Sequence, residues 1–161
     1  MADSLRLHMI SFSEAVAKCS ALNNLLEVGG RNVFLLEDCK DRQSFFSKKL
    51  LRHNLHVEET AEGATGFFLE DPKRWDLIFL AHDLHDTHYT APLDHFRQWQ
   101  KKNTEKGRPQ TGYNFAKAIA PHLTEQQMVV CHSLNRPGRQ MILEALPQAL
   151  MIDFLELTAV M

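Results

Sequence analysis

The sequence predicts an α/β protein with a three-layer, doubly wound parallel sheet. Three short apolar runs, NVFLL at 32–36, DLIFLA at 76–81 and MVVC at 128–131, have the length and composition of fully buried strands. The segments around them place apolar residues three or four positions apart, as an amphipathic helix does. Buried strands that alternate with such helices are typical of a parallel sheet covered by helices on both faces.

The other elements follow in order along the chain. The stretch FSEAVAKCSALNNLLE at 12–27 predicts a helix that VGG at 28–30 ends, and LRLHMI at 5–10 could form a short strand before it. Further helices are expected at 41–54, 111–123 and 139–150, and further strands at 56–61 and 151–157. The segment GATGFFLEDPKRW at 63–75 contains two glycines and a proline, so no helix is predicted there. We expect an N-terminal helical extension at 1–30 and an α/β domain at 31–161, with an insertion at 86–110.

The composition restricts the classes of function. The chain has 161 residues, a net charge of -2, 44% hydrophobic and 24% charged residues, so neither double-stranded nucleic acid nor a membrane surface is an expected partner. No apolar stretch reaches the roughly 18 residues that span a bilayer, and the N-terminus lacks the pattern of a signal peptide. Cys19, Cys39 and Cys131 are an odd number without CxxC spacing, which predicts reduced thiols in a cytoplasmic protein. A homo-oligomer is left open.

Polar side chains follow each of the three apolar runs: Glu37-Asp38, His82-Asp83 and His132-Ser133. The carboxyl ends of parallel strands meet at one edge of a sheet, where ligands of such folds bind. We therefore expect these side chains to converge on one site. The alternative for the acidic pair is a turn or a helix N-cap, where aspartate is common.

Carboxylate and imidazole groups at this edge suit two kinds of chemistry. Asp38, Asp83 and Glu37 could ligate a divalent ion, with Mg, Mn, Ni or Zn as candidates. His82 could be such a ligand or a general acid that protonates a leaving alkoxide. A route without metal, with His82 and His132 as an acid/base pair, is equally compatible with the sequence. For His85, His88 and His95 a structural role is favoured.

The stretch CHSLNRPGRQM at 131–141 joins a strand to a helix. Backbone N–H groups at the start of that helix would favour an anion such as phosphate, and Arg136 or Arg139 could add a bidentate clamp. The alternative is a well-capped turn in which Ser133 and Asn135 serve only the backbone. The insertion at 86–110 is locally basic between Arg97 and Arg108, which suits a phosphate-bearing substrate or, equally, a solvated loop.

These motifs resemble response-regulator receiver domains, which carry an acidic pair after the first strand, an aspartate after the third and Ser or Thr after the fourth. Glu37-Asp38, Asp83 and Ser133 occur in that order, but MIDFLEL at 151–157 lacks the lysine of a signalling receiver. The closer resemblance is to cyclic-phosphate processing receiver-like domains, carried by LLEDCKDR, by WDLIFLAHDLHD and by TGYNFAKAI with VVCHSLNRPGRQMI. That family usually has Asp-His-Asp where this chain has Ala81-His82-Asp83.

The resemblance implies a flavodoxin-like receiver fold and a phosphodiesterase-type hydrolase that acts on a cyclic phosphate or cyclic nucleotide. The implied catalytic residues are His82, His132 and Asp83. The expected substrate-binding residues are Ser133, Asn135, Arg136, Arg139 and Thr111. The alternatives are a protein that sequesters a cyclic nucleotide, a degenerate receiver that binds other proteins, and, last, an HD phosphohydrolase, whose His-Asp pair lies on helices rather than after a strand.

Overall fold

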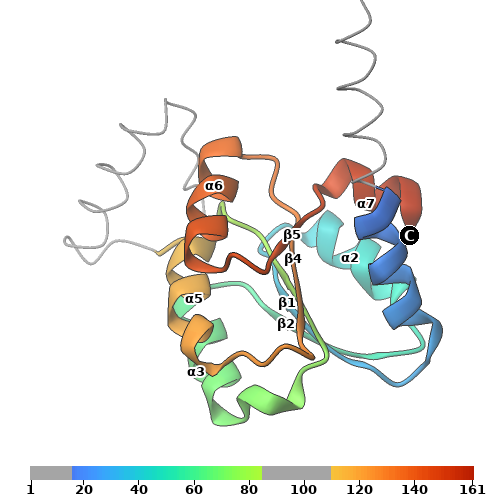
Figure 1. Ribbon diagram of the computed structural model, residues 1–161, viewed down its shortest axis with the longest axis horizontal. Helices are drawn as coiled ribbons and strands as arrows, with labels where there is room; N and C mark the ends of the chain where they lie inside the picture. The colour runs from blue at the N-terminus through green and yellow to red at the C-terminus, as the bar shows by residue number, and fades with distance from the viewer. Residues whose placement is uncertain (1–15, 85–109) are drawn as a thin grey trace, which may run out of the picture.

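The computed structural model describes residues 16–84 and 110–161 (Figure 1). Its centre is a five-stranded parallel sheet of order β2-β1-β3-β4-β5. The strands are β1 (Asn32–Leu36), β2 (Asn54–Glu58), β3 (Leu77–Leu80), β4 (Met128–Cys131) and β5 (Leu150–Met151). The order 2-1-3-4-5 is that of flavodoxin-like, doubly wound folds. The predicted fold class is therefore confirmed.

Helices cover both faces of the sheet and complete the three layers (Figure 1). One face carries α3 (Ala61–Glu70), α5 (Gly112–Ile119) and α6 (Arg136–Ala145), and the other carries α2 (Lys40–Lys49), α7 (Phe154–Val160) and a helix that includes residues 16–27. Short 3-10 turns, η1 (Pro72–Arg74) and η2 (Ala120–His122), precede β3 and follow α5. No helix in the described part of the chain is long and apolar enough to cross a membrane.

Alternation along the strands divides the buried side chains between two cores. Phe34 and Leu36 of β1 face the core under α3, α5 and α6, whereas Val33 and Leu35 face the core under α2 and α7. Successive side chains of an extended strand point to opposite faces, so both faces of β1, β3 and β4 must be apolar. This is why these strands read as unbroken apolar runs in the sequence.

The N-terminal helix belongs to the second core. Leu22 is fully buried there and Cys19 nearly so, and the Asn23 side chain donates to the carbonyl of Val160 in α7. The helix thus packs on the α/β domain rather than projecting from it. The predicted strand at 5–10 and residues 12–15 of the predicted helix lie outside the described residues.

One sequence prediction was wrong, and one helix was not predicted. The stretch 151–157 was expected to be a strand, but β5 ends at Met151 and α7 begins at Phe154, because the Asp153 side chain accepts from the Glu156 N–H and Glu156 accepts from the Asp153 N–H. The sequence does not predict a helix at 63–75, yet α3 spans most of this segment. Thr60 caps that helix, and its buried face packs well enough to offset two glycines. The expected strand at 56–61 is β2, which ends at Glu58.

Candidate functional site

The polar residues that follow β1, β3 and β4 lie at one edge of the sheet. Leu36 pairs with Leu80, and Leu80 with Cys131, so the three strands end at the same level. The backbone continues this alignment by one residue, since Ala81 N–H donates to Leu36 O at 3.0 Å and His132 N–H donates to Leu80 O at 3.1 Å. The expected convergence at the carboxyl edge is therefore present in the fold.

Glu37 and His132 form a buried pair across this edge. His132 Nε2 lies 2.8 Å from Glu37 Oε2, and the side chains are 0% and 1% exposed, respectively. Strand alternation places both on the side of α2, where the His132 ring packs 5.1 Å from the ring of Phe46 and 6.3 Å from that of Phe79. The pair links the ends of β1 and β4 across the end of β3, the strand between them.

Both oxygens of the Glu37 carboxylate contact other groups of the protein. Its Oε1 accepts from the Cys39 N–H at 3.0 Å, and its Oε2 lies 3.8 Å from the Arg42 guanidinium besides contacting His132. Burial on its own would raise the pKa of Glu37, but the hydrogen bond and charge of His132, the Cys39 N–H and Arg42 together lower that pKa below its usual value. Glu37 is thus a fixed buried anion that anchors its neighbours.

His82, Asp83 and Asn135 form a second group at the same edge. His82 Nδ1 lies 2.7 Å from Asp83 Oδ1, and the Asn135 side-chain amide donates to the same oxygen at 2.9 Å. The Asn135 amide oxygen in turn accepts from the Gly138 N–H at 3.1 Å and so caps α6. The turn after β3 is thereby tied to the first turn of α6.

Gly138 completes this group, because its backbone lies against the His82 side chain. A Cβ at Gly138 would lie 2.4 Å from His82 Cγ and 2.6 Å from its Nδ1, so the imidazole rests directly on the helix backbone. His82 is fully buried, whereas the Asp83 side chain is 24% exposed. We call His82, Asp83, Asn135 and Gly138 the α6 contact ring. Asp83 is the ionisable member of it that faces solvent.

The two histidines of the predicted acid/base pair lie on different faces of the sheet. His132 packs against Phe46 in the layer of α2, while His82 packs against Gly138 of α6. Alternation along the strands accounts for both positions: His132 directly follows Cys131 and so points to the face opposite Cys131, whereas His82 lies two residues after Leu80 and shares the face of Leu80 and α6. They do not share one point of contact for a substrate.

Thr111 and Gly112 dock α5 onto the turn after β3. The Gly112 N–H donates to His82 O at 2.9 Å, and a Cβ at Gly112 would come within 1.8 Å of Ala81 O. Only glycine permits so close an approach of two backbones. Thr111 is fully buried, and its N–H donates to the Asn114 amide oxygen at 3.0 Å. The structure therefore gives Thr111 a role in starting α5.

Ser133 shapes the connection from β4 to α6. It is 4% exposed, and its hydroxyl oxygen accepts from the Asn135 N–H at 3.1 Å. For Ser133 the geometry matches the alternative of a capped turn. Asn135 fits both interpretations, because one amide group caps α6 through its oxygen and holds Asp83 through its nitrogen. The sequence did not predict the close fit of Gly138 to His82 or of Gly112 to Ala81, because Pro-Gly indicated only a turn and Thr-Gly only the start of a helix.

The predicted metal ligands do not assemble into a complete set. Asp38 is half-buried beside Glu37, but both Glu37 oxygens already accept hydrogen bonds from the protein. Within 16–84 and 110–161, no group of three or more His, Cys, Asp or Glu side chains could hold a metal ion. His85, Asp86 and His88, which follow this stretch of the edge in sequence, lie outside the described residues.

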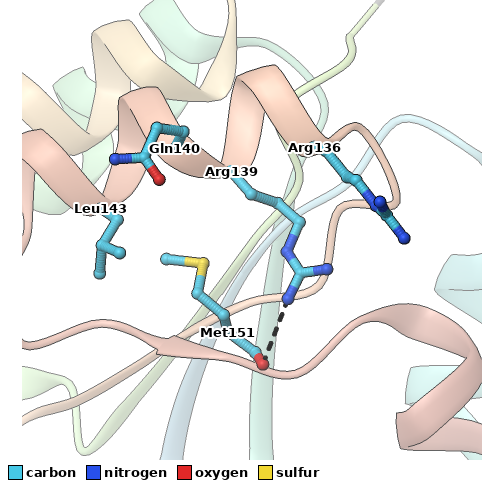
Figure 2. Close-up of a pocket in the computed structure, with 5 residues that line it drawn as sticks. All are labelled: Arg136, Arg139, Gln140, Leu143 and Met151. Atoms are coloured by element: carbon cyan, nitrogen blue, oxygen red, sulfur yellow. Dashed lines mark hydrogen bonds between the residues drawn. The ribbon is translucent and has the colours of Figure 1, made fainter. Parts of the chain in front are cut away.

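Arg136 and Arg139 line a groove beside the α6 contact ring (Figure 2). Its other lining residues are Gln140, Leu143 and Met151, and its volume is about 250 Å³. Arg139 turns toward β5, where it donates to Met151 O at 3.4 Å (Figure 2). Arg139 thus faces β5, whereas Asn135 and Gly138 face Asp83 and His82.

Comparison with known proteins adds similarities of fold alone. The chain is 18% identical to the signal receiver domain of a LuxO-type repressor protein from Vibrio parahaemolyticus, with a TM-score of 0.41 over 65% of this chain and 62% of that one. It is 11% identical to a LuxR-family two-component response regulator from Aurantimonas, with a TM-score of 0.40 over 72% and 69% of the two chains. A structure of yeast Ypd1 with the receiver domain of Ssk1 gives 15% identity and a TM-score of 0.39 over 73% and 74%.

No protein-family model matches the chain, and no curated protein matches it. The chain spans less than two thirds of the Vibrio receiver chain that it resembles. The fold is receiver-like: its strand order and its layers are those of the flavodoxin-like class to which receivers belong.

Proposed function

We propose that the protein is a phosphodiesterase-type hydrolase that opens a cyclic phosphate, with Asp83 as the general base. The observation that carries this proposal is the α6 contact ring. A partly exposed carboxylate stands at the carboxyl edge of a doubly wound sheet, and a buried imidazole and a helix-capping amide hold it. Ligands of this architecture bind at that edge.

The geometry assigns separate tasks to the members of the ring. The contacts from His82 and from Asn135 both fall on Asp83 Oδ1, so these two side chains help to fix the orientation of the carboxylate. His82 cannot rotate away because its ring lies against Gly138. His82 and Asn135 therefore act as positioning residues, and the partly exposed Asp83 carboxylate is the proposed base that meets a water or substrate.

The proposed step is attack of water on a cyclic phosphodiester. Asp83 takes one proton as the water oxygen forms a bond to phosphorus, and the ring P–O bond breaks on the opposite side. The leaving alkoxide takes a proton from solvent, and Asp83 returns its proton to solvent. The net reaction adds one water to a cyclic phosphodiester and gives one phosphomonoester.

A turnover assay with an isosteric variant tests the proposal. In Asp83→Asn the amide oxygen can still accept from His82 and Asn135, but the basic oxygen is lost. We expect product formation from 2′,3′- and 3′,5′-cyclic nucleotides to fall by about 10²-fold or more, the usual contribution of a general base. The matched control is Glu125→Gln, which removes an exposed carboxylate from the loop before β4, at the other end of the sheet. That variant should retain wild-type turnover.

Two results would contradict hydrolysis and favour another function. Tight binding of a cyclic nucleotide without product would indicate a sequestering protein. Neither binding nor turnover would leave a degenerate receiver that binds other proteins. The observation that favours this last function is Ala81, which follows β3 at the position where the cyclic-phosphate processing family usually has an aspartate.

A further inference from the structure

The groove between α6 and β5 has the features of a second ligand site. Arg136, Arg139, Gln140 and Leu143 follow one another at steps of three, one and three residues, which places them on one face of α6. Met151 of β5 forms the opposite wall (Figure 2). Gly138, Met141 and Ile142 on the other side of α6 are buried against the domain, so the groove face is distinct from the packing face.

The two arginines of the groove differ in their electrostatic environment. Arg139 is held by the Met151 carbonyl, and its guanidinium lies 4.0 Å from the Asp153 carboxylate, which offsets much of its charge. Arg136 is exposed and has no hydrogen bond or ion pair with any other described residue. Gln140 is also exposed on the same face. Among the described residues, no carboxylate offsets the charge of Arg136, so its guanidinium is the cationic group that the groove offers to an anion.

The remaining walls of the groove are apolar. Leu143 and Met151 are half-buried, and a methionine thioether packs favourably against the edge or face of an aromatic ring. A volume of about 250 Å³ is small for a ligand pocket, which usually has roughly 300–1,000 Å³. A single phosphate with one flat ring system fits these dimensions better than a dinucleotide.

We infer that the α6–β5 groove binds a nucleoside monophosphate. The phosphate binds the guanidinium of Arg136, and the base lies against Leu143 and Met151. This site goes beyond the proposed hydrolysis, because it uses none of His82, Asp83 or Asn135. Its product-like ligand would bind whether or not the α6 contact ring hydrolyses anything.

Titration of the full chain with adenosine 5′-monophosphate, followed by ¹H–¹⁵N chemical shifts, tests this inference. We expect saturable shifts in the amides of residues 136–143 and 150–152. Arg136→Ala should weaken binding by about tenfold or more, since a charge-assisted hydrogen bond is lost. Arg136 makes no contact that folding requires, so the variant should fold normally. Lys48→Ala, which removes one exposed positive charge from α2, should bind as the wild type does.

Three results would overturn the inference: no shifts at these residues, equal affinity in Arg136→Ala, or equal affinity for adenosine without phosphate. Equal affinity for inorganic phosphate would overturn the assignment of the apolar walls to a base. Asp83→Asn should leave the affinity unchanged, so failure of the hydrolase proposal and failure of this inference give different results.

Discussion

Replacing Gly138 with alanine tests how His82 is held. The added Cβ would lie 2.4 Å from His82 Cγ, 2.6 Å from Nδ1 and 2.8 Å from Cδ2. Ordinary contacts begin at about 3.4 Å, so the ring must retreat by about 1 Å. The His82–Asp83 hydrogen bond starts at 2.7 Å and would then exceed the roughly 3.2 Å limit unless Asp83 moves as well.

The energetic cost can be estimated against a matched glycine. Overpacking of a tight site typically costs about 1–3 kcal/mol, whereas alanine in place of a helical glycine gains up to about 1 kcal/mol. Gly138→Ala should therefore lower the free energy of unfolding by about 1–2 kcal/mol. Gly66→Ala in α3 places its Cβ in open space and should raise the free energy of unfolding by up to about 1 kcal/mol.

Urea denaturation of both variants, with turnover measured in parallel, is the appropriate assay. We expect opposite signs for the two stability changes, and loss of turnover in Gly138→Ala alone. Equal stabilisation of both variants, with full turnover retained, would show that the His82 ring does not rest on α6 and that the contact ring does not position Asp83.

Three further predictions concern the rest of the edge and the thiols. Gly112→Ala should lower the free energy of unfolding by about 3 kcal/mol or prevent folding, because its Cβ would meet the Ala81 carbonyl at 1.8 Å; a normal denaturation midpoint would refute that contact. Glu37→Ala should cost about 3 kcal/mol at pH 7 because it breaks a buried pair. The folded-state pKa of Glu37 is lowered, so this stabilisation is present above the unfolded-state pKa and is lost as the pH falls through the folded-state pKa; a gap between wild type and variant that persists in acid would contradict it. In the native protein a thiol reagent should label the exposed Cys39 well before Cys131, whose burial raises its pKa to about 11, and mass spectrometry of the labelled peptides would reveal the opposite order.

The sheet was predictable because its inner strands are buried on both faces. Such strands must be apolar at every position, and this makes β1, β3 and β4 visible as unbroken runs. The helix α3 was hidden because Gly63 and Gly66 lower its propensity, while the packing that stabilises it involves residues distant in sequence. In 151–157, short alternation suggested a strand, and the Asp153–Glu156 capping box proved the stronger signal.

The site was predictable in location but not in its pairing. Parallel strands bring their carboxyl ends together in any fold of this class, so convergence of the three polar pairs followed from the topology. The partner of each side chain depends on which face it takes. Alternation directs Glu37 and His132 to one face and His82 to the face of α6, but the register that pairs Leu80 with Cys131 sets Ala81, not His82, level with His132. No pattern in a single sequence fixes the register between two strands.

The most direct test of the account is hydrolysis of a cyclic nucleotide in ¹⁸O-labelled water, followed by ³¹P NMR. The account predicts a phosphomonoester with one ¹⁸O atom on phosphorus for each turnover by the wild type, and almost none from Asp83→Asn. A cyclic nucleotide that binds and stays intact, or labelled product formed equally fast by both proteins, would contradict the proposed role of Asp83.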